Sequence, residues 1–487
     1  MTDITGENAG WHSGLNRRTA VVWPVFLVIG LPLLVTVIFL LLKLFQHYIF
    51  FNSFDASIYT NLAWNIAHGN GFWSSILQKN HLGEHFSPIM ALFAPLYAIF
   101  PSANVLMTAQ GIAVGGACWL LLPLNRAINH DFPRNRQLAL AAAVFILYLF
   151  YRPMVSALLC QFHPSTLGMP LLACAILSLH YRKNAFLAVL VLGLLLTKEL
   201  AILSVTGLAL YSWLVLHQRK TPLALGLTAL LAAILVFKVI MPSFQEGEWG
   251  HMLRLQPFSH LKLKLIYLTR LIVPLALLPL AGWRALIPAM PLISLNLLVN
   301  FEPQFTIIRH YDDQASVFLI VSAIHGARRV ALWVQRRDFT IVRRPAFLIP
   351  GAIMTSLILG LVAWEAATYF LRKTPVLKRE EIQTIANSHR HLKKLQNSPS
   401  EVRLISHSGL APYLCHRTRF MLMQTYMERN KIEDQDLIVF SRWRYPFDNL
   451  EEVQQYLDTH EKLVLKEILD SIKVYGIKPA CTAIVSR

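Results

Sequence analysis

Charged residues are scarce in this sequence. Only 15% of the 487 residues are Asp, Glu, Lys or Arg, and 55% are hydrophobic, whereas a soluble domain averages about 25% charged residues. The deficit extends to about residue 370, and charges return from Leu371 onward. The composition therefore excludes a wholly soluble protein. It predicts a cytoplasmic N-terminus at 1–20, a membrane-embedded region at 21–370 and a soluble region at 371–487.

Acidic residues and cysteines are few as well. There are 27 Asp and Glu against 45 Lys and Arg, which gives a formal net charge of +18. In a soluble protein this charge would favour nucleic acid, but membrane proteins keep Lys and Arg in cytoplasmic loops. We therefore expect a lipid bilayer as the partner and no nucleic acid. Of the five cysteines, Cys415 and Cys481 lie in the soluble region, and sequence separation leaves open whether they pair.

Long apolar segments are abundant. They predict about eleven membrane-spanning helices, some shorter than the ~20 residues that cross a bilayer. The first is too long for the apolar part of a signal peptide, so we expect it to be retained. Two later segments are separated only by residues 197–199, and this break is compatible with a kink. The segments lie at 21–44, 104–124, 137–152, 165–181, 185–197, 200–216, 222–241, 265–282, 284–300, 312–328 and 345–370.

Arginines indicate the orientation of these spans. The segment 325–344 carries six arginines, and short loops rich in Lys and Arg remain in the cytoplasm. Alternation along the chain then places the N-terminus inside, and the first loop (45–103) and the C-terminal domain outside, as in a bacterial inner-membrane protein. This assignment requires residues 86–100 to lie on or dip into the outer leaflet, because a true span there would place the arginines of 125–136 outside.

The region after residue 370 predicts a small α/β domain. Residues 378–396 and 449–460 have helical spacing, and short strands are predicted at 402–406, 419–423, 436–441 and 482–485. Strands that alternate with helices favour a three-layer arrangement. No Gly-rich phosphate loop occurs, which argues against a nucleotide site there. The predicted fold class is an α-helical polytopic membrane protein with a small C-terminal extracytoplasmic α/β domain.

The first outer loop contains only two carboxylates, Asp55 and Glu84. Asp55 follows the first span closely and should lie near the lipid surface. A carboxylate that is partly desolvated there is a candidate general base or metal ligand. The alternative is that Asp55 caps a helix at 56–68, since Asp is a preferred N-cap residue. The two roles are compatible.

A second motif in this loop is His81-Leu-Gly-Glu84-His85. It matches the H-x-x-E-H signature of inverted zinc proteases, but Gly83 and Pro88 disfavour the helix that a protease needs. Binding of a divalent metal ion for another purpose is one alternative, and bonding of polar loop residues to the backbone is the other. Glu84 and His85 also remain candidate catalytic residues.

Two further groups of polar residues are candidates for substrate binding. Lys198 and Glu199 interrupt a long apolar run, and charges at membrane depth are costly unless they pair or serve a function. The alternative is a polar contact that stabilises a kink. Arg309, His310 and Tyr311 lie at the outer end of a predicted span. Arginine suits bidentate contacts with phosphate.

Several of these motifs together resemble a bacterial family of membrane proteins, the domain of unknown function 2079. The family in turn resembles the multi-pass, C-type glycosyltransferases. These enzymes take a sugar from a polyprenyl-phosphate carrier on the outer face and use an acidic residue of the first outer loop. The resemblance implies this fold, and Asp55 for that role; Leu200 departs from the family, which has a small residue after Lys-Glu. The matching segments are 54–59, 64–72, 80–88, 94–97, 162–164, 197–199, 309–311 and 408–414.

The resemblance implies transfer of a sugar from a polyprenyl-phosphate-linked sugar to an acceptor. Asp55 would deprotonate the acceptor or bind a metal, and Arg309 would hold phosphate. A transporter or flippase for a lipid-linked or small solute is a different class, and it would show internal repeats with paired broken helices, which we do not find. A non-catalytic membrane scaffold is the third class. The sequence gives neither the sugar nor the acceptor nor the oligomeric state.

Overall fold

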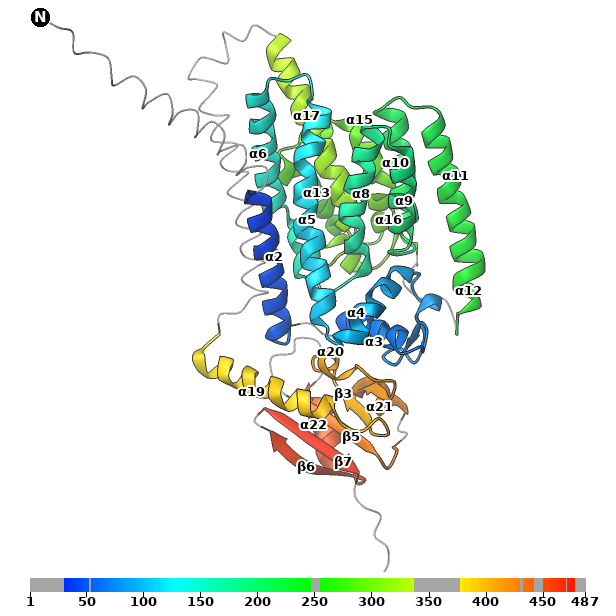
Figure 1. The fold of residues 1–487 in the computed structure, drawn as a ribbon, viewed down its shortest axis with the longest axis vertical. Helices are drawn as coiled ribbons and strands as arrows, with labels where there is room; N and C mark the ends of the chain where they lie inside the picture. The colour runs from blue at the N-terminus through cyan, green and yellow to red at the C-terminus, as the bar shows by residue number, and fades with distance from the viewer. Residues whose placement is uncertain are drawn as a thin grey trace, which may run out of the picture.

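The computed structural model describes residues 30–51, 54–246, 255–336, 377–429, 432–441, 450–469 and 471–477. They form a helical bundle and a small α/β unit that lies against one end of it (Figure 1). The expected span at 345–370 lies outside the described residues, as does the beginning of the span at 21–44.

Each expected span up to residue 328 contains a helix in the bundle. Among the described residues, four helices are long and apolar enough to cross a membrane, and α6 with α7 would add a fifth span bent by 50°. These four are α2, α5, α17 and the continuous helix of α11, a π-helical turn (Leu235–Ile240) and α12. The bounds are α2 Leu31–Tyr48, α5 Asn104–Ile128, α6 Arg134–Phe150, α7 Arg152–Leu159, α8 Pro164–His180, α9 Asn184–Leu195, α10 Ala201–Leu214, α11 Lys220–Ile234, α12 Met241–Ser243, α13 Leu261–Ile272, α14 Leu278–Ala281, α15 Trp283–Leu286, α16 Met290–Leu298 and α17 Asp313–Arg336.

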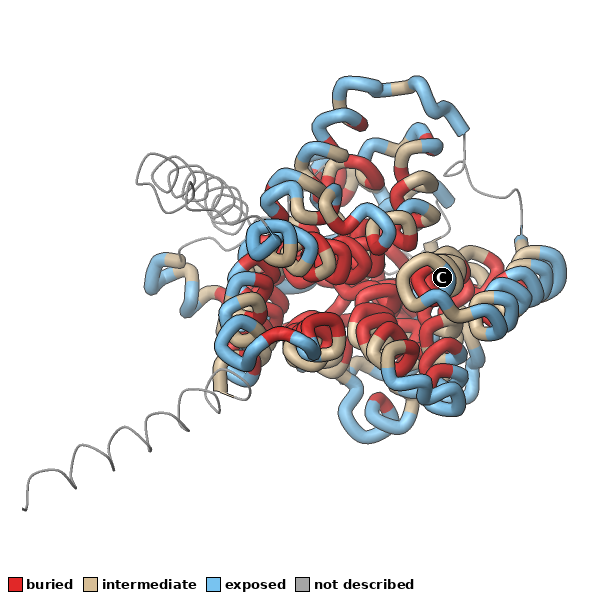
Figure 2. Tube along the Cα trace, turned by 90° about the horizontal axis from the view of Figure 1, so that it is seen from above, coloured by how far each residue is buried: buried red, intermediate tan, exposed pale blue. Residues whose placement is uncertain are grey.

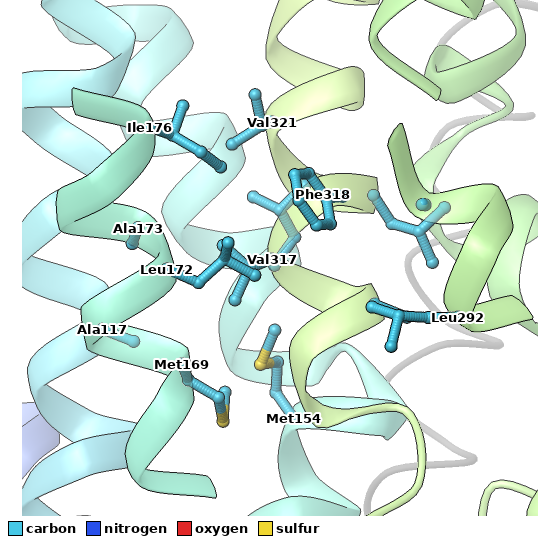
Figure 3. Packing of buried hydrophobic residues seen from close by; sticks show 14 of the residues in the cluster. Ala117, Met154, Met169, Leu172, Ala173, Ile176, Leu292, Val317, Phe318 and Val321 are labelled. Atoms are coloured by element: carbon cyan, nitrogen blue, oxygen red, sulfur yellow. The ribbon is translucent and has the colours of Figure 1, made fainter. Parts of the chain in front are cut away.

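Apolar side chains occupy both the centre and the outside of the bundle. Buried residues gather in the middle (Figure 2), where Leu172 of α8 points toward Val317 of α17 and Met169 of α8 lies beside Met154 of α7 (Figure 3). Leucines such as Leu223 on α11 are nonetheless exposed. Soluble monomers rarely expose contiguous apolar surface of this extent. The outer surface is therefore that of a protein embedded in lipid.

Small residues bring two of the spanning helices close together. Gly111 and Gly115 of α5 face α2, and a Cβ atom built on Gly115 would lie 2.7 Å from Thr36 Cα. The spacing G-x-x-x-G permits such backbone contact between helices in membranes. This contact fixes α2, and with it the start of the first outer loop, against the bundle.

Lys198 and Glu199 lie at a turn between two helices. α9 ends at Leu195, α10 begins at Ala201, and the two helices pack against each other. The break is therefore the corner of a helical hairpin, and a kink within one continuous helix is not observed. The hairpin places both charges at the end of the bundle beside the first loop, where the Ile89 N–H donates to the Leu196 carbonyl at 3.0 Å.

The first outer loop folds into short elements at the end of the bundle next to the α/β unit. They are α3 (Phe54–Ala67), the hairpin β1–β2 (Trp73–Ser74 and Lys79–Asn80), a 3-10 turn (His81–Gly83), a 3-10 helix (Pro88–Phe93) and α4 (Ala94–Ile99). The segment 86–100 stays at this end, as the orientation required (Figure 1). Its exposed apolar residues include Leu92 and Ile99, which suit an element dipping into a leaflet.

The C-terminal unit has the predicted three layers. Its sheet has the order β4-β3-β5-β7-β6, with β3, β4 and β5 parallel and β7 antiparallel to both β5 and β6. α19 and α20 cover one face of the sheet, and α21 and α22 cover the other. The bounds are α19 Arg379–Gln396, β3 Arg403–Ser406, α20 Ala411–Leu414, β4 Phe420–Leu422, α21 Met423–Arg429, β5 Asp436–Ser441, α22 Leu450–Thr459, β6 Leu463–Leu469 and β7 Ile472–Ile477.

The hairpin β6–β7 was not predicted. Most of β6 is exposed, so it lacks the apolar alternation that marks a half-buried strand. The predicted strand at 482–485 and Cys481 lie outside the described residues, while Cys415 is buried. The unit docks on the first outer loop through Asn61, whose amide donates to the carbonyls of Cys415 at 2.7 Å and Arg417 at 3.2 Å.

The orientation predicted from the arginines can be tested. We expect a phosphatase reporter fused after residue 375 to be active, and one fused at Arg337 to be silent, because this enzyme works only outside the cytoplasm. Activity assays on intact cells, with reporter amounts matched by immunoblot, measure the difference. The reverse pattern would contradict the orientation and every assignment to the outer face.

Candidate active site

A cavity of about 310 Å³ lies where the first loop, the α9–α10 turn and the segment before α17 meet. Four segments that are far apart in the sequence contribute to it: 54–55, 83–85, 198–200 and 301–311, with His163 between them. Among its lining residues are seven of the predicted site residues: Asp55, Glu84, His85, Lys198, Glu199, Arg309 and Tyr311. His310 lines a smaller recess beside it, which Lys198 and Tyr311 share.

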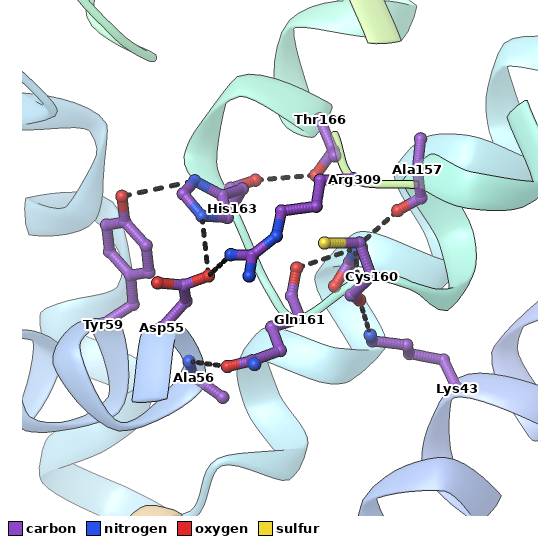
Figure 4. A network of polar contacts seen from close by, with 11 residues as sticks. Lys43, Asp55, Ala56, Tyr59, Ala157, Cys160, Gln161, His163, Thr166 and Arg309 are labelled. Carbon is purple, nitrogen blue, oxygen red and sulfur yellow. Dashed lines mark hydrogen bonds and ion pairs between the residues drawn. The ribbon is translucent and has the colours of Figure 1, made fainter. Parts of the chain in front are cut away.

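Asp55 lines this cavity from the first turn of α3, and its carboxylate points toward His163 and Arg309 (Figure 4). Its Oδ2 lies 3.4 Å from His163 Nε2 and 3.8 Å from Arg309 Nη1. The capping alternative is not supported. The helix begins one residue earlier than Asp55, and the Ala56 N–H donates to the Gln161 side chain at 3.1 Å. Among the described residues the Asp55 carboxylate bonds to no backbone N–H, so it faces the cavity while the helix N-terminus favours its charge.

His163 connects Asp55 to Tyr59. Burial raises the pKa of Tyr59, so its hydroxyl stays protonated and donates to His163 Nδ1, 3.4 Å away. Because Nδ1 accepts this hydrogen bond, the proton of the neutral His163 ring is on Nε2, which donates to Asp55. The tautomer is inferred from the partners of the two ring nitrogens. Burial keeps the pKa of His163 well below 6.5. His163 therefore orients the carboxylate as an uncharged donor.

Glu199 is held by the first loop. Its carboxylate accepts from the His85 ring at 3.0 Å and from the Phe86 backbone N–H at 3.0 Å. Burial alone would raise the pKa of Glu199, but the adjacent His85 ring holds it at about 2. The contact therefore fixes the α9–α10 corner against the loop that carries His85.

Lys198 differs from its neighbour. It is 4% exposed, it lines both the cavity and the recess, and no described residue provides a hydrogen-bond or ion-pair partner for its ammonium group. Buried charges normally have such a partner. An ammonium group that faces a cavity in this way is suited to an anionic ligand.

Arg309 is the second cation of the cavity. The carboxylates that would make it a purely structural arginine are engaged elsewhere. Asp312 accepts from Tyr267 at 2.6 Å and from Asn296 at 3.1 Å, and Glu302 lies 3.4 Å from His260. With its side chain 40% exposed and only a 3.8 Å contact to Asp55, Arg309 has donors available for a ligand.

His81, Glu84 and His85 have separate surroundings in the structure. Glu84 forms an ion pair with Lys79, and His85 bonds to Glu199. His81 is fully buried, and neither of its ring nitrogens has a hydrogen-bond partner within the described part of the chain. Over the described ranges, no three His, Cys, Asp or Glu side chains lie close enough to hold a metal ion. The H-x-x-E-H spacing thus does not produce convergent ligands here.

The other side of the cavity is apolar. It is formed by Leu200 of the hairpin corner, Phe237 and Met241 of the α11–α12 helix, Leu295 of α16 and Phe301. The α11–α12 helix is the least buried of the four long helices, at 17%, and stands at the edge of the bundle (Figure 1). This wall could not be predicted from the sequence, because nothing in an apolar helix marks which residues face a cavity.

The buried histidines make stability depend on pH. Burial lowers the pKa of His81 to about 3 and keeps those of His163 and His310 well below 6.5. Below pH ~6.5 the denatured chain therefore binds more protons than the folded chain. As the pH decreases from there, the free energy of unfolding falls by up to about 1.4 kcal/mol per pH unit for each histidine. We expect a lower melting temperature in detergent at pH 5 than at pH 7, with a smaller difference in His81→Gln. If the melting temperatures of wild type and His81→Gln changed equally between pH 7 and pH 5, His81 would not contribute to the pH dependence.

Comparisons with known proteins agree with the fold. The sequence profile of a family described as predicted membrane protein (DUF2079) matches residues 46–466. Two crystal structures of ArnT from Cupriavidus metallidurans are similar at 12% identity, and each alignment covers 94% of this chain and 98% of ArnT. The TM-score is 0.50 for the apo state and 0.49 for the structure bound to undecaprenyl phosphate. No curated protein matches the sequence. Since its profile covers most of the sequence, the chain belongs to the DUF2079 family of predicted membrane proteins.

Proposed function

We propose that the protein transfers a sugar from a polyprenyl-phosphate carrier to an acceptor hydroxyl at the outer face of the inner membrane. One observation carries the proposal. A single cavity combines a carboxylate, Asp55, with two cations, Lys198 and Arg309, and with an apolar wall on the lipid-facing α11–α12 helix. A lipid-linked sugar phosphate needs all three: a polar site for the sugar, cations for phosphate and an apolar surface for the chain.

Asp55 acts as the general base in this proposal. Its carboxylate takes the proton of the acceptor hydroxyl, and the acceptor oxygen attacks the anomeric carbon of the sugar. The bond from that carbon to the phosphate oxygen then breaks, and polyprenyl phosphate leaves with the electron pair. His163 and Tyr59 hold Asp55 in place through the contacts at 3.4 Å. General base catalysis of this kind contributes about 10²–10⁴-fold.

Lys198 and Arg309 stabilise the charge that builds up on the leaving phosphate. They come from two different segments that line the cavity, one from the α9–α10 corner and one from the segment before α17. Cations placed where charge develops lower the barrier without reorganising during the reaction. The first loop lines the cavity and also contacts the C-terminal unit through Asn61. We therefore assign selection of the acceptor to the C-terminal unit.

The Arg309 contact can be tested by substitution. We expect Arg309→Ala to weaken binding of polyprenyl phosphate about tenfold, the lower end for a hydrogen bond to a charged group, because the side chain is partly exposed. Arg309→Lys should recover only part of the affinity, since lysine lacks the planar fork. Melting temperatures in detergent with and without added polyprenyl phosphate measure this. Equal ligand-induced shifts in wild type and Arg309→Ala would remove Arg309 from the site.

The function itself is tested with purified protein in liposomes. Radiolabelled polyprenyl-phosphate sugars are supplied together with a mixture of membrane acceptors, and transfer of label is followed. A transferase moves label from the carrier to an acceptor. A flippase moves the intact labelled lipid between leaflets, and a scaffold does neither, so either result would contradict the proposal.

A further inference from the structure

We propose that a second cavity, at the opposite end of the bundle, binds the phosphate headgroup of an anionic membrane phospholipid. This cavity of about 270 Å³ lies between the end of α10, the α14–α15 segment and α17. Its titratable lining residues are all basic: His217, Arg284, His325, Arg328 and Arg329. None of the described residues that line it is Asp or Glu. It is independent of the proposed transferase site.

Two of these cations have donors free for a ligand. Arg328 is neutralised by Asp131, with Nη2 2.8 Å from Oδ2. Arg329 gives one N–H to the Ala281 carbonyl at 3.0 Å and retains its other donors. Arg284 lies over the Trp283 ring, and no described carboxylate pairs with it. Two guanidinium groups that reach one cavity from α15 and α17 match the geometry of a phosphate.

The walls of this cavity are held in place by close packing. Ser322 Oγ of α17 donates to the carbonyls of Pro279 and Gly282, each at 3.2 Å. A Cβ atom at Gly282 or Gly326 would overlap the backbone of the facing segment, so both positions require glycine. His325 is fixed by the Tyr211 hydroxyl at 2.9 Å. The arginines are therefore carried on a preformed wall, which lowers the cost of binding.

The position of the cavity indicates a lipid as its ligand. Large aromatic side chains are exposed at the same end of the bundle: Tyr181, Trp213, Trp283 and Trp333. Trp and Tyr gather at the level of the lipid headgroups. Exposed Leu280 and Val330 provide apolar surface beside the cavity for acyl chains. Basic pockets between helices on the cytoplasmic side bind the headgroups of anionic lipids. Arginines that serve only to orient the protein in the membrane would not need to converge on a cavity.

Lipid binding can be measured on the purified full-length protein in detergent. Native mass spectrometry and melting temperature would be compared for phosphatidylglycerol, phosphatidylcholine and inorganic phosphate. The test variant is Arg284→Gln/Arg329→Gln. The matched control is Arg136→Gln/Arg219→Gln, which removes the same charge at the same end but outside the cavity.

We expect wild type and the control to bind phosphatidylglycerol at least about tenfold more tightly than phosphatidylcholine, and the test variant to lose at least about tenfold in affinity for phosphatidylglycerol. Inorganic phosphate should produce no comparable shift in melting temperature. If both double variants lost the same affinity for phosphatidylglycerol, binding would depend only on the overall surface charge, and the proposal would be overturned. A shift with inorganic phosphate as large as that with lipid would assign the cavity to a soluble anion and overturn the lipid assignment.

Discussion

Asp55→Asn should reduce sugar transfer by about 10²-fold or more while leaving the fold intact. The expected loss is the lower range for removing a general base. Asparagine has nearly the same shape, and its Oδ1 can still accept from His163 Nε2–H, which lies 3.4 Å from the carboxylate. Only the basicity and the charge are removed. The initial rate of label transfer, at saturating donor, measures the effect.

A matched control for this variant is Glu302→Gln. Glu302 is a carboxylate close in sequence to the cavity residues Phe301 and Gln304, but it does not line the cavity and its side chain is 56% exposed. We expect this variant to keep the wild-type rate. Melting temperatures of all three proteins should agree within about 2 °C, since exposed or isosteric changes alter stability by only about 0.5 kcal/mol. A wild-type rate in Asp55→Asn would remove Asp55 from catalysis.

Lys198→Met should have opposite effects on the empty and the ligand-bound protein. Lys198 is 4% exposed, and its ammonium group has no hydrogen-bond or ion-pair partner among the described residues. Methionine has a similar length and avoids the desolvation cost, so the melting temperature without ligand should stay equal or rise. Affinity for polyprenyl phosphate should fall about 30- to 160-fold, because a buried charge–phosphate hydrogen bond contributes about 2–3 kcal/mol.

The matched control is Lys238→Met. Lys238 lies in the π-helical turn that continues α11 and does not line the cavity. We expect the control to bind polyprenyl phosphate like wild type. A structural lysine at position 198 would behave in the reverse way: its loss would lower the melting temperature of the empty protein and leave the affinity unchanged. Titration of the melting temperature with polyprenyl phosphate distinguishes the two.

Much of the architecture could be read from the sequence. Scarcity of charge predicted the membrane region, and the arginines of 325–344 predicted an orientation. Both predictions are possible because the cost of moving charged residues into lipid applies to each segment separately. In the C-terminal unit, strands β3, β4 and β5 and helices α19 and α22 occur where the local pattern predicted them. Local periodicity and desolvation are properties of short segments, and one sequence is sufficient to read them.

The cavity residues could be predicted one by one from the sequence, but their proximity could not. Asp55 was predicted as a carboxylate near the lipid surface, Lys198 as a charge at membrane depth, and Arg309 as a phosphate ligand at the end of a span. The structure places all three around one cavity. His163, whose ring links Asp55 to Tyr59, appeared in the sequence only as part of a matching motif.

Other features depend on chain segments that meet only in three dimensions. Gln161, more than 100 residues from Ala56, supplies the side chain at the start of α3. The apolar wall at Phe237 and Met241 is made by a helix whose sequence is apolar all round. Composition and local pattern were sufficient to identify the apolar segments and the polar residues that are costly among them. Which of these residues share a cavity depends on how helices far apart in the chain pack, and this packing leaves no periodic trace in either sequence segment.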